Sequence, residues 1–254
     1  MLDALYISAI GLRAQQEQLD ATANNFANLS TTAFKRQSVD FAAILDRGPA
    51  LSGADPASTT DARPNSLQRF DMAQGEVHAT GRALDVAIVG SGFLEVELAD
   101  NKTGYSRAGS LQISADGGLS LASGQALKAD VRIPSGAKAV QIQADGSVTA
   151  QLPGESTPRV VGQIELATFT NAGVLQYRGD GIFIAPEGTA DPTRSRPGEG
   201  GTEPLATQSL EASNVNMTDE MVSMTLMQRV YELNSRVAQV ADELMGMANN
   251  LRRG

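Results

Sequence analysis

Apolar residues recur every seven positions at both ends of the chain, and this spacing predicts a long helix at each terminus. Near the first terminus the stripe consists of Leu5, Leu12, Leu19 and Phe26, in a stretch without proline. Near the other terminus, steps of three and four alternate through Val230, Leu233, Val237, Val240, Leu244, Met247 and Leu251. A seven-residue period sustained this long is typical of a coiled-coil seam. A helix packed on its own domain is the alternative, but a second heptad helix at the other terminus favours the coiled coil.

The start of the C-terminal helix is marked by capping residues. Asn216 is a suitable N-cap, because its side chain can accept a hydrogen bond from a free backbone N–H. Asp219 and Glu220 follow in the first turn, where negative charge complements the helix dipole. Arg252 and Arg253 stand at the opposite end, where positive charge is favourable. These signals predict a helix from about residue 217 to the end of the chain.

The middle of the chain has the pattern of β-strands. Runs rich in β-branched or alternating residues predict strands at Asp85–Val89, Phe93–Leu98 and Gln163–Phe169. Turn signals lie at Asp116-Gly117, Asp145-Gly146, Asn171–Gly173 and Asp180-Gly181. Two similar segments, residues 111–117 and 140–146, each lead from a strand into an Asp-Gly turn. They predict a pair of hairpins rather than a repeat array.

Two segments rich in Pro, Gly, Ser and Thr separate the strands from the helices, at Arg47–Asn65 and Pro186–Pro204. The predicted fold is therefore α+β, with a β-rich domain inserted between two terminal helices that form a coiled-coil inner domain. We assign residues 1–30 and 214–254 to the inner domain, 31–75 to an extended linker, 76–185 to the β-rich outer domain and 186–213 to a return linker. Two paired terminal helices outside the β-rich domain would form a thin stalk. The stalk would expose apolar residues unless neighbouring copies of the chain cover them.

Composition excludes several classes of function. A net charge of −9 argues against a nucleic-acid binder, which needs a basic face to displace counterions. The chain has no Cys and one His, His78, so neither a disulfide framework nor a thiolate or histidine metal cluster is expected. The N-terminal apolar run contains Asp3 and is interrupted by Arg13, which does not fit a secretory signal. No apolar run reaches the length needed to span a bilayer.

No motif predicts catalysis or a cofactor. Gly90-Ser91-Gly92 follows a strand, but a dinucleotide loop needs a third glycine and a helix, and here another strand follows. The Asp residues beside glycines fit turns, and no spaced carboxylates form an acid–base pair or a calcium loop. We therefore expect a protein without enzymatic activity, metal or cofactor.

Residues 23–36, at the end of the first apolar stripe, contain Asn24, Asn25, Asn28, Thr31, Phe34 and Lys35. This pattern resembles the N-terminal signature of the flagellar axial family, the rod, hook and hook-junction proteins. Phe26 and Ala33 depart from the usual pattern, which has Leu or Ile and Gly there, and Ala33 disfavours a positive φ.

Two further segments are similar to the same family. Residues 84–93, with Tyr105-Ser106-Arg107-Ala108-Gly109, resemble its central block. The C-terminal signature is matched after Glu211 and Ala212 by Ser213, Asn214, Val215, Gln228, Arg229, Tyr231, Glu232 and Asn234. Val230 replaces the usual Ala and keeps the seam apolar.

The resemblance implies a structural subunit that leaves through the flagellar type III export apparatus without a cleaved secretory signal. It further implies helical polymerisation into a hollow drive shaft, which spans the periplasm and carries motor torque to the hook. The implied partners are other copies, other rod and hook subunits and the surrounding bushing rings, with no nucleic acid and no membrane insertion. The asparagines of the N-terminal signature are expected to cap or bridge backbone at the end of the first helix.

Within the family, the C-terminal half is most similar to the distal rod members. The short interval between Lys35 and Asp85, and the approach Gly81–Asp85, keep the proximal rod paralogue as an alternative. A binding module with a coiled-coil stalk and a β head is the alternative from another class. It predicts a fixed small oligomer rather than open-ended growth.

Overall fold

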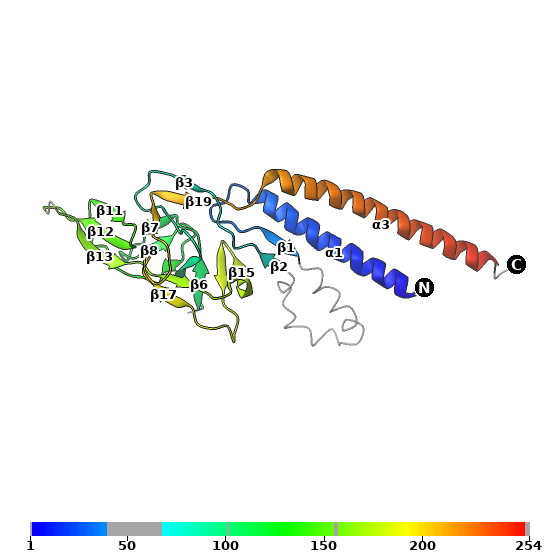
Figure 1. Cartoon of the computed structure of the whole chain (residues 1–254), viewed down its shortest axis with the longest axis horizontal. Helices are drawn as coiled ribbons and strands as arrows, with labels where there is room; N and C mark the ends of the chain where they lie inside the picture. Colours follow the sequence, from blue (N-terminus) through cyan, green and yellow to red (C-terminus); the bar gives the residue numbers. More distant parts are fainter. Residues whose placement is uncertain (1, 40–67, 101, 155–156, 252–254) are drawn as a thin grey trace. The chain divides into compact units, whose positions relative to one another are not determined.

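The computed structural model describes residues 2–39, 68–100, 102–154 and 157–251 (Figure 1). The predicted segment Arg47–Asn65 lies outside these residues. The described residues form two compact units. The helical unit contains α1 (Leu2–Ala27), β1 (Gln37–Val39), β2 (Gln68–Phe70) and α3 (Met217–Leu251), and the β unit contains Asn28–Arg36 and Asp71–Asn214. The chain is therefore an α+β protein with a helix at each end, as predicted.

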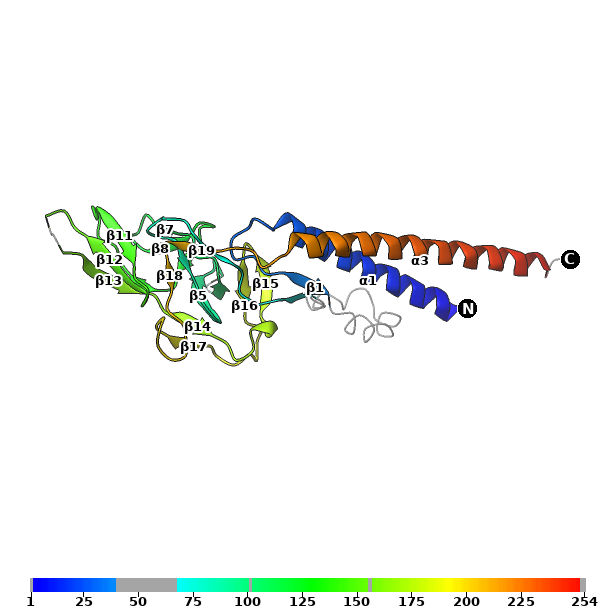
Figure 2. The ribbon, with the colours of Figure 1, turned by 45° about the horizontal axis from the view of Figure 1, so that its top comes forward.

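In the helical unit α1 and α3 lie side by side and run in opposite directions (Figures 1 and 2). The predicted N-cap of α3 is confirmed, because the Asn216 side chain accepts a hydrogen bond from the Thr218 N–H at 2.9 Å. Asp219 and Glu220 occupy the first turn, as the sequence predicted. β1 and β2 pair antiparallel, with Gln37 opposite Phe70.

The β unit contains short antiparallel strands in two larger sheets. The first sheet has the path β15-β16-β6-β5-β9-β8-β7, with β14 joined to β5 and β17 joined to β14; the second has the order β10-β13-β12-β11. Two separate pairs, β18 with β4 and β19 with β3, bring the end of the unit beside its beginning. The strands are β3 (Val77–Ala79), β4 (Val86–Ala87), β5 (Gly92–Glu97), β6 (Thr103–Ser106), β7 (Leu111–Ile113), β8 (Leu119–Leu121), β9 (Ala126–Leu127), β10 (Asp130–Val131), β11 (Ala139–Ile142), β12 (Ser147–Gln151), β13 (Arg159–Gln163), β14 (Leu166–Thr168), β15 (Gln176–Gly179), β16 (Ile182–Ile184), β17 (Thr193–Ser195), β18 (Ala206–Thr207) and β19 (Ser209–Glu211).

One aliphatic core joins the two larger sheets. Alternation along β5 sends Leu94 and Val96 into this core and Phe93 to the opposite face, because successive strand residues point to opposite sides. Phe93 packs edge-on against Phe169 and Phe183, which gives the second face an aromatic cluster. The buried aliphatic residues are Val86, Ile88, Leu94, Val96, Leu111, Leu119, Leu121, Leu127, Val131, Ile133, Val140, Ile142, Val148, Ala150, Ile164, Leu166, Ile182 and Leu205.

The two predicted Asp-Gly hairpins are confirmed. β7 leads into β8 through Gly117, and β11 leads into β12 through Gly146. Both glycines have a positive φ, near +80°, which a residue with a Cβ rarely adopts. The similar segments at residues 111–117 and 140–146 are therefore structurally equivalent turns, each placed in a different sheet.

Two sequence-based boundaries were wrong. Gln163–Phe169 was predicted as one strand, but Gln163 ends β13 in the second sheet and Leu166 begins β14 in the first. A period-two pattern cannot reveal that a strand changes sheets. The interval 186–213 was expected as a linker, yet it contains β17, β18 and β19. Its Pro and Gly residues mark turns between short paired strands rather than an absence of pairing.

Candidate assembly site

The N-terminal signature leaves α1 through a tight turn that its own side chains close. Thr31 donates hydrogen bonds to Asn28, from its N–H to the carbonyl oxygen at 3.2 Å and from its hydroxyl to Oδ1 at 3.0 Å. Ala33 follows with φ of +56°, so the residue adopts the left-handed conformation that the sequence disfavoured. Its N–H donates to the Glu211 carbonyl oxygen at 2.8 Å. The strained residue therefore aligns the signature with the last strand of the β unit.

A buried ion cluster joins the three family motifs inside the β unit. Lys35, Arg107 and Glu211 come from the N-terminal, central and C-terminal motifs, and their side chains are almost fully buried. Lys35 Nζ donates to Glu211 Oε1 at 2.6 Å, and Arg107 Nε donates to Glu211 Oε2 at 3.0 Å. The Gly75 N–H donates to the same carboxylate at 2.8 Å. One carboxylate therefore links segments that are more than 100 residues apart in the sequence.

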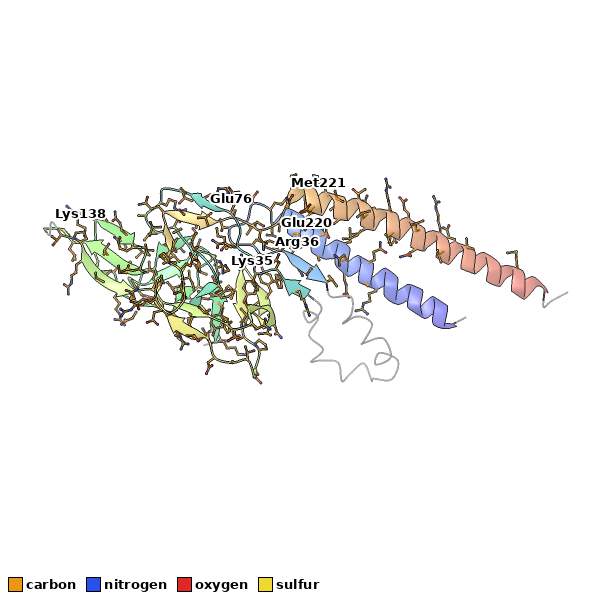
Figure 3. The ribbon with its side chains drawn as sticks, in the orientation of Figure 1. Lys35, Arg36, Glu76, Lys138, Glu220 and Met221 are labelled. Carbon is orange, nitrogen blue, oxygen red and sulfur yellow. The ribbon has the colours of Figure 1, made fainter. Side chains whose placement is uncertain are left out.

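Both cations also donate to backbone carbonyls. Lys35 Nζ donates to the Ala73 carbonyl oxygen at 2.6 Å (Lys35 is labelled in Figure 3). Arg107 donates from its terminal nitrogens to the carbonyls of Ile88, Gly90 and Gly92 at 2.8–3.2 Å. The turn that resembled a phosphate loop thus presents carbonyl oxygens to an arginine. Buried hydrogen bonds of this kind hold their segments firmly, because each lost bond leaves a costly unpaired group.

The cluster contains two cations and one carboxylate, so it carries a net positive charge when all three groups are ionised. Burial lowers the pKa of the Lys35 ammonium, the nearby Arg107 guanidinium lowers it further, and the bond to Glu211 opposes both effects. The charge on Glu211 is therefore the element that keeps two buried cations tolerable.

Asn214 fixes the same region through its amide group. Its Oδ1 accepts from the Arg36 N–H at 2.6 Å, and its Nδ2 donates to the carbonyls of Asp71 and Ala73 at 2.8 and 3.0 Å. Its own N–H donates to the Phe34 carbonyl oxygen at 3.3 Å. Phe34 is buried, whereas Ser213 and Val215 are half-buried. The two terminal signatures are thus hydrogen-bonded to each other by backbone and side chain.

In the helical unit Asn25 bridges backbone, as the resemblance implied. The side chain is 1% exposed; its Oδ1 accepts from the Gln37 N–H at 2.7 Å and its Nδ2 donates to the Gln37 carbonyl oxygen at 2.8 Å. Asn24 Nδ2 donates to the Gln37 side chain at 2.9 Å. The end of α1 is therefore attached to the first residue of β1.

Polar and small residues mediate the contact between α1 and α3. Gln15 Nε2 donates to the Met227 carbonyl oxygen at 2.7 Å, and Asn234 Nδ2 donates to Gln15 Oε1 at 3.0 Å. The Thr22 hydroxyl lies 3.9 Å from the Met227 sulfur. Ala14 and Ala21 are buried on α1, which allows the helices to approach closely.

The predicted apolar residues of α3 whose side chains the structure describes lie outside this contact. We call Leu226, Val230, Leu233, Val237, Val240 and Met247 the apolar stripe; their exposed fractions lie between 46% and 62%. On α1 Leu19 is 36% exposed and Phe26 is half-buried. In the C-terminal signature Gln228, Arg229, Tyr231 and Glu232 are exposed and Asn234 is half-buried. The side chains of Leu5, Leu12, Leu244 and Leu251 lie outside the described part of the structure.

Sequence reasoning did not assign roles to Gln15, Gln37, Arg107 and Glu211. Arg107 and Glu211 stood within quoted motifs, but the alternation in β19 would have placed the apolar Leu210 inward, whereas Ser209 and Glu211 are the buried residues. Their partners are too distant in the sequence for a local pattern to reveal. Gln15 and Gln37 carried no signal beyond polarity.

Within the described residues, no helix is long and apolar enough to cross a membrane. The same residues contain no group of three or more His, Cys, Asp or Glu side chains placed to hold a metal ion.

Three segments match families of flagellar proteins. Residues 5–35 match the family described as Flagella basal body rod protein. Residues 87–150 match the Flagellar hook protein FlgE/F/G D1 domain, and residues 206–251 match the Flagellar basal body rod FlgEFG protein C-terminal family. Each matched segment contains one member of the ion cluster: Lys35, Arg107 or Glu211.

Relatives of known name match over nearly the whole chain. The flagellar basal-body rod protein FlgG of Buchnera aphidicola subsp. Baizongia pistaciae is 33% identical over 255 residues, covering 96% of this chain and 98% of that protein. FlgG of Caulobacter vibrioides is 32% identical over 261 residues, covering 99% and 100%. The flagellar basal-body rod protein FlgF of Escherichia coli is 32% identical over 266 residues, covering 98% of each chain.

Proposed function

The chain belongs to the family of flagellar basal-body rod proteins, and we propose that this structural subunit polymerises helically by burying the apolar stripe of α3 against neighbouring copies. The observation that carries the proposal is the exposure of that stripe. Six large apolar side chains lie on one helix, while the intrachain contact with α1 uses other residues. An exposed apolar surface of this kind marks a site of association.

The energetics favour several neighbours per subunit. Full burial of a Val, Leu or Met side chain contributes about 1.5–3 kcal/mol, so a side chain that is already half buried contributes about 1 kcal/mol. The six residues of the stripe then supply about 6 kcal/mol, near the lower end of the ~4–15 kcal/mol cost of association. One contact is therefore weak, and a polymer in which each subunit touches several others is stable. A coiled-coil inner domain of terminal helices from many copies fits this requirement.

The proposal is tested with Val240→Asp and the matched control Gln239→Asp. Val240 is 53% exposed in the single chain, so the new charge costs little in the monomer but is buried at the proposed interface. Gln239 is also exposed, and one position turns an α-helix by about 100°, which places it off the stripe. A loss of about 3 kcal/mol raises the critical concentration about 100-fold. Pelleting assays and swimming motility should fail for Val240→Asp and persist for Gln239→Asp; equal behaviour of the two variants would contradict the proposal.

Rod membership implies assembly with other flagellar rod and hook subunits in the basal body. We propose the distal position, because FlgG relatives of 32–33% identity span 96–99% of the chain, with the proximal position as the alternative supported by FlgF. In that position the polymer would be a hollow drive shaft across the periplasm, in contact with the surrounding bushing rings. Localisation of a tagged subunit in intact basal bodies distinguishes the two positions.

Export is proposed to use the flagellar type III apparatus without cleavage of a secretory signal. The support is the family alone. Mass measurement of the subunit recovered from basal bodies tests this point, since a shortened N-terminus would exclude it.

A further inference from the structure

The helix α3 has two different faces, and the chain packs the less apolar one against its own α1. We call Glu220, Met227 and Asn234 the contact stripe; they are spaced seven residues apart, and each is buried or half-buried. Figure 3 places Glu220 on the side of α3 toward α1 and Met221, which is 46% exposed, on the side away from it. Leu226 and Leu233, of the apolar stripe, each precede a contact-stripe residue by one position. One position turns the helix by about 100°.

Hydrophobicity alone favours the opposite packing. A rotation of α3 by about 100° would place Leu226 and Leu233 where Met227 and Asn234 now lie. The apolar stripe would then face α1, next to the buried Ala14 and Ala21. A single chain in that arrangement would bury its own association surface. The observed packing therefore needs a feature that penalises the rotated arrangement.

Gln15 supplies that feature. It is half-buried at the helix contact, and both ends of its amide are satisfied by α3, at the Met227 carbonyl and at the Asn234 side chain. In the rotated packing Leu233 would take the place of Asn234, and a leucine side chain has no N–H to donate to Gln15 Oε1. A polar side chain in a helix interface that is satisfied in one packing and unsatisfied in another selects the first.

We propose that the Gln15–Asn234 amide pair selects the face of α3 that packs against α1 and so keeps the apolar stripe outward. The pair is a positioning device inside one chain. Its benefit for assembly rests on the proposed function, because the outward stripe is the surface that neighbouring copies would cover. The packing preference itself can be tested in the dilute monomer, where assembly plays no part.

The experiment uses Gln15→Leu in the full chain, with Gln16→Leu as the matched control. Gln16 is exposed, so the control adds the same side chain one position away from the contact. Because the natural chain has no cysteine, a single reporter thiol can be introduced at Leu233 on the apolar stripe or at Met227 on the contact stripe. The rate of reaction with a maleimide then reports which stripe is exposed.

With Gln15→Leu we expect reciprocal changes. The thiol at Leu233→Cys should react about tenfold more slowly, because a thiol buried in a helix contact is inert, and the thiol at Met227→Cys should react faster. Gln16→Leu should leave both rates unchanged. If both thiols react faster in Gln15→Leu, the helices have separated and Gln15 only stabilises the contact, which overturns the proposal. Unchanged rates at both positions overturn it as well.

These outcomes are separable from a failure of the proposed function. Val240→Asp could still polymerise, while in Gln15→Leu the maleimide reaction rates at positions 227 and 233 still change in opposite directions. In that case the selection of the helix face would stand and the assembly surface would have to be sought elsewhere.

Discussion

Replacement of Glu211 by glutamine should strongly destabilise the β unit, although the two side chains are nearly the same size. The substitution retains the volume of the side chain but removes the one negative charge in contact with Lys35 and Arg107. Both cations remain buried, and their positions are fixed by carbonyls on separate segments. Breaking a buried pair by removing one partner costs about 3–5 kcal/mol, because the remaining charge loses its compensation.

The contacts of the carboxylate support the upper part of that range. The Glu211 carboxylate accepts three hydrogen bonds, from Lys35 at 2.6 Å, from the Gly75 N–H at 2.8 Å and from Arg107 at 3.0 Å. A glutamine retains one oxygen, while its NH₂ group faces at least one of these donors. With its oxygen at the Oε1 position, glutamine keeps the bonds from Lys35 and Gly75, and the Arg107 Nε–H loses its acceptor. In the opposite orientation the bonds from Lys35 and Gly75 are lost, so at least one buried donor loses an acceptor either way.

Lys35→Met should cost less, about 1–3 kcal/mol, although it also removes charge from the cluster. The lowered pKa of Lys35, caused first by burial and then by Arg107, indicates that its charge is disfavoured in the folded chain. Methionine leaves the Arg107–Glu211 pair, which is neutral overall. The order of destabilisation should therefore be Glu211→Gln above Lys35→Met.

The assay is urea denaturation of the full chain, followed by the near-UV circular dichroism of the buried aromatic residues. Glu76→Gln is the matched control, because Glu76 lies in the same unit and its side chain is 79% exposed. For a domain of this size 1 kcal/mol corresponds to about 2–4 °C, so Glu211→Gln should also lower Tm by about 6–20 °C. The reasoning is refuted if Glu211→Gln unfolds with the same free energy as the control, or if Lys35→Met is the more damaging change.

Three further outcomes follow from individual contacts. Asn25→Ala should lower stability by about 1–3 kcal/mol, because it leaves the N–H and the carbonyl of Gln37 without their partner. Hydrogen exchange of the Gln37 amide is the measurement, and unchanged protection would contradict this prediction. Gly109→Ala should prevent normal folding, since an added Cβ would lie 1.5 Å from the Val86 carbonyl oxygen; a native-like near-UV spectrum would refute this. The pKa of Asp145 is held below its ordinary value first by the Ser147 hydroxyl and then by the Ser147 N–H, so Ser147→Ala should raise it in an NMR titration. The pKa of Asp145 is lower in the folded chain than in the unfolded chain. The stabilisation by Asp145 is therefore present above the unfolded pKa and is lost as pH falls through the folded pKa. An unchanged pKa of Asp145 in Ser147→Ala would contradict the role of Ser147.

Features set by local chemistry could be predicted from the sequence. The cap at Asn216, the Asp-Gly turns at Gly117 and Gly146 and the helix at each end depend on residues within a few positions of one another, and all are observed. Local chemistry does not determine which strand a segment pairs with. For that reason the pattern of Gln163–Phe169 predicts one strand, although its two ends belong to different sheets.

The site was predictable only in part for the same physical reason. The resemblance marked Lys35 and Asn214, but the partners of Lys35 come from segments far along the chain, and only the folded structure brings them together. The heptad pattern identified apolar residues of α3 such as Val240. It could not show that α3 would pack on α1 through Asn234, because a periodic pattern states which residues share a face and not what that face contacts.

Sedimentation velocity of the full chain over a wide range of concentration tests most directly whether exposed apolar residues of α3 drive polymerisation. We predict open-ended growth with rising concentration for the natural chain and for Gln239→Asp, and a monomer at the same concentrations for Val240→Asp. A single discrete oligomer at every concentration, or growth that Val240→Asp does not reduce, would contradict helical polymerisation through this stripe and favour a closed stalk of fixed size.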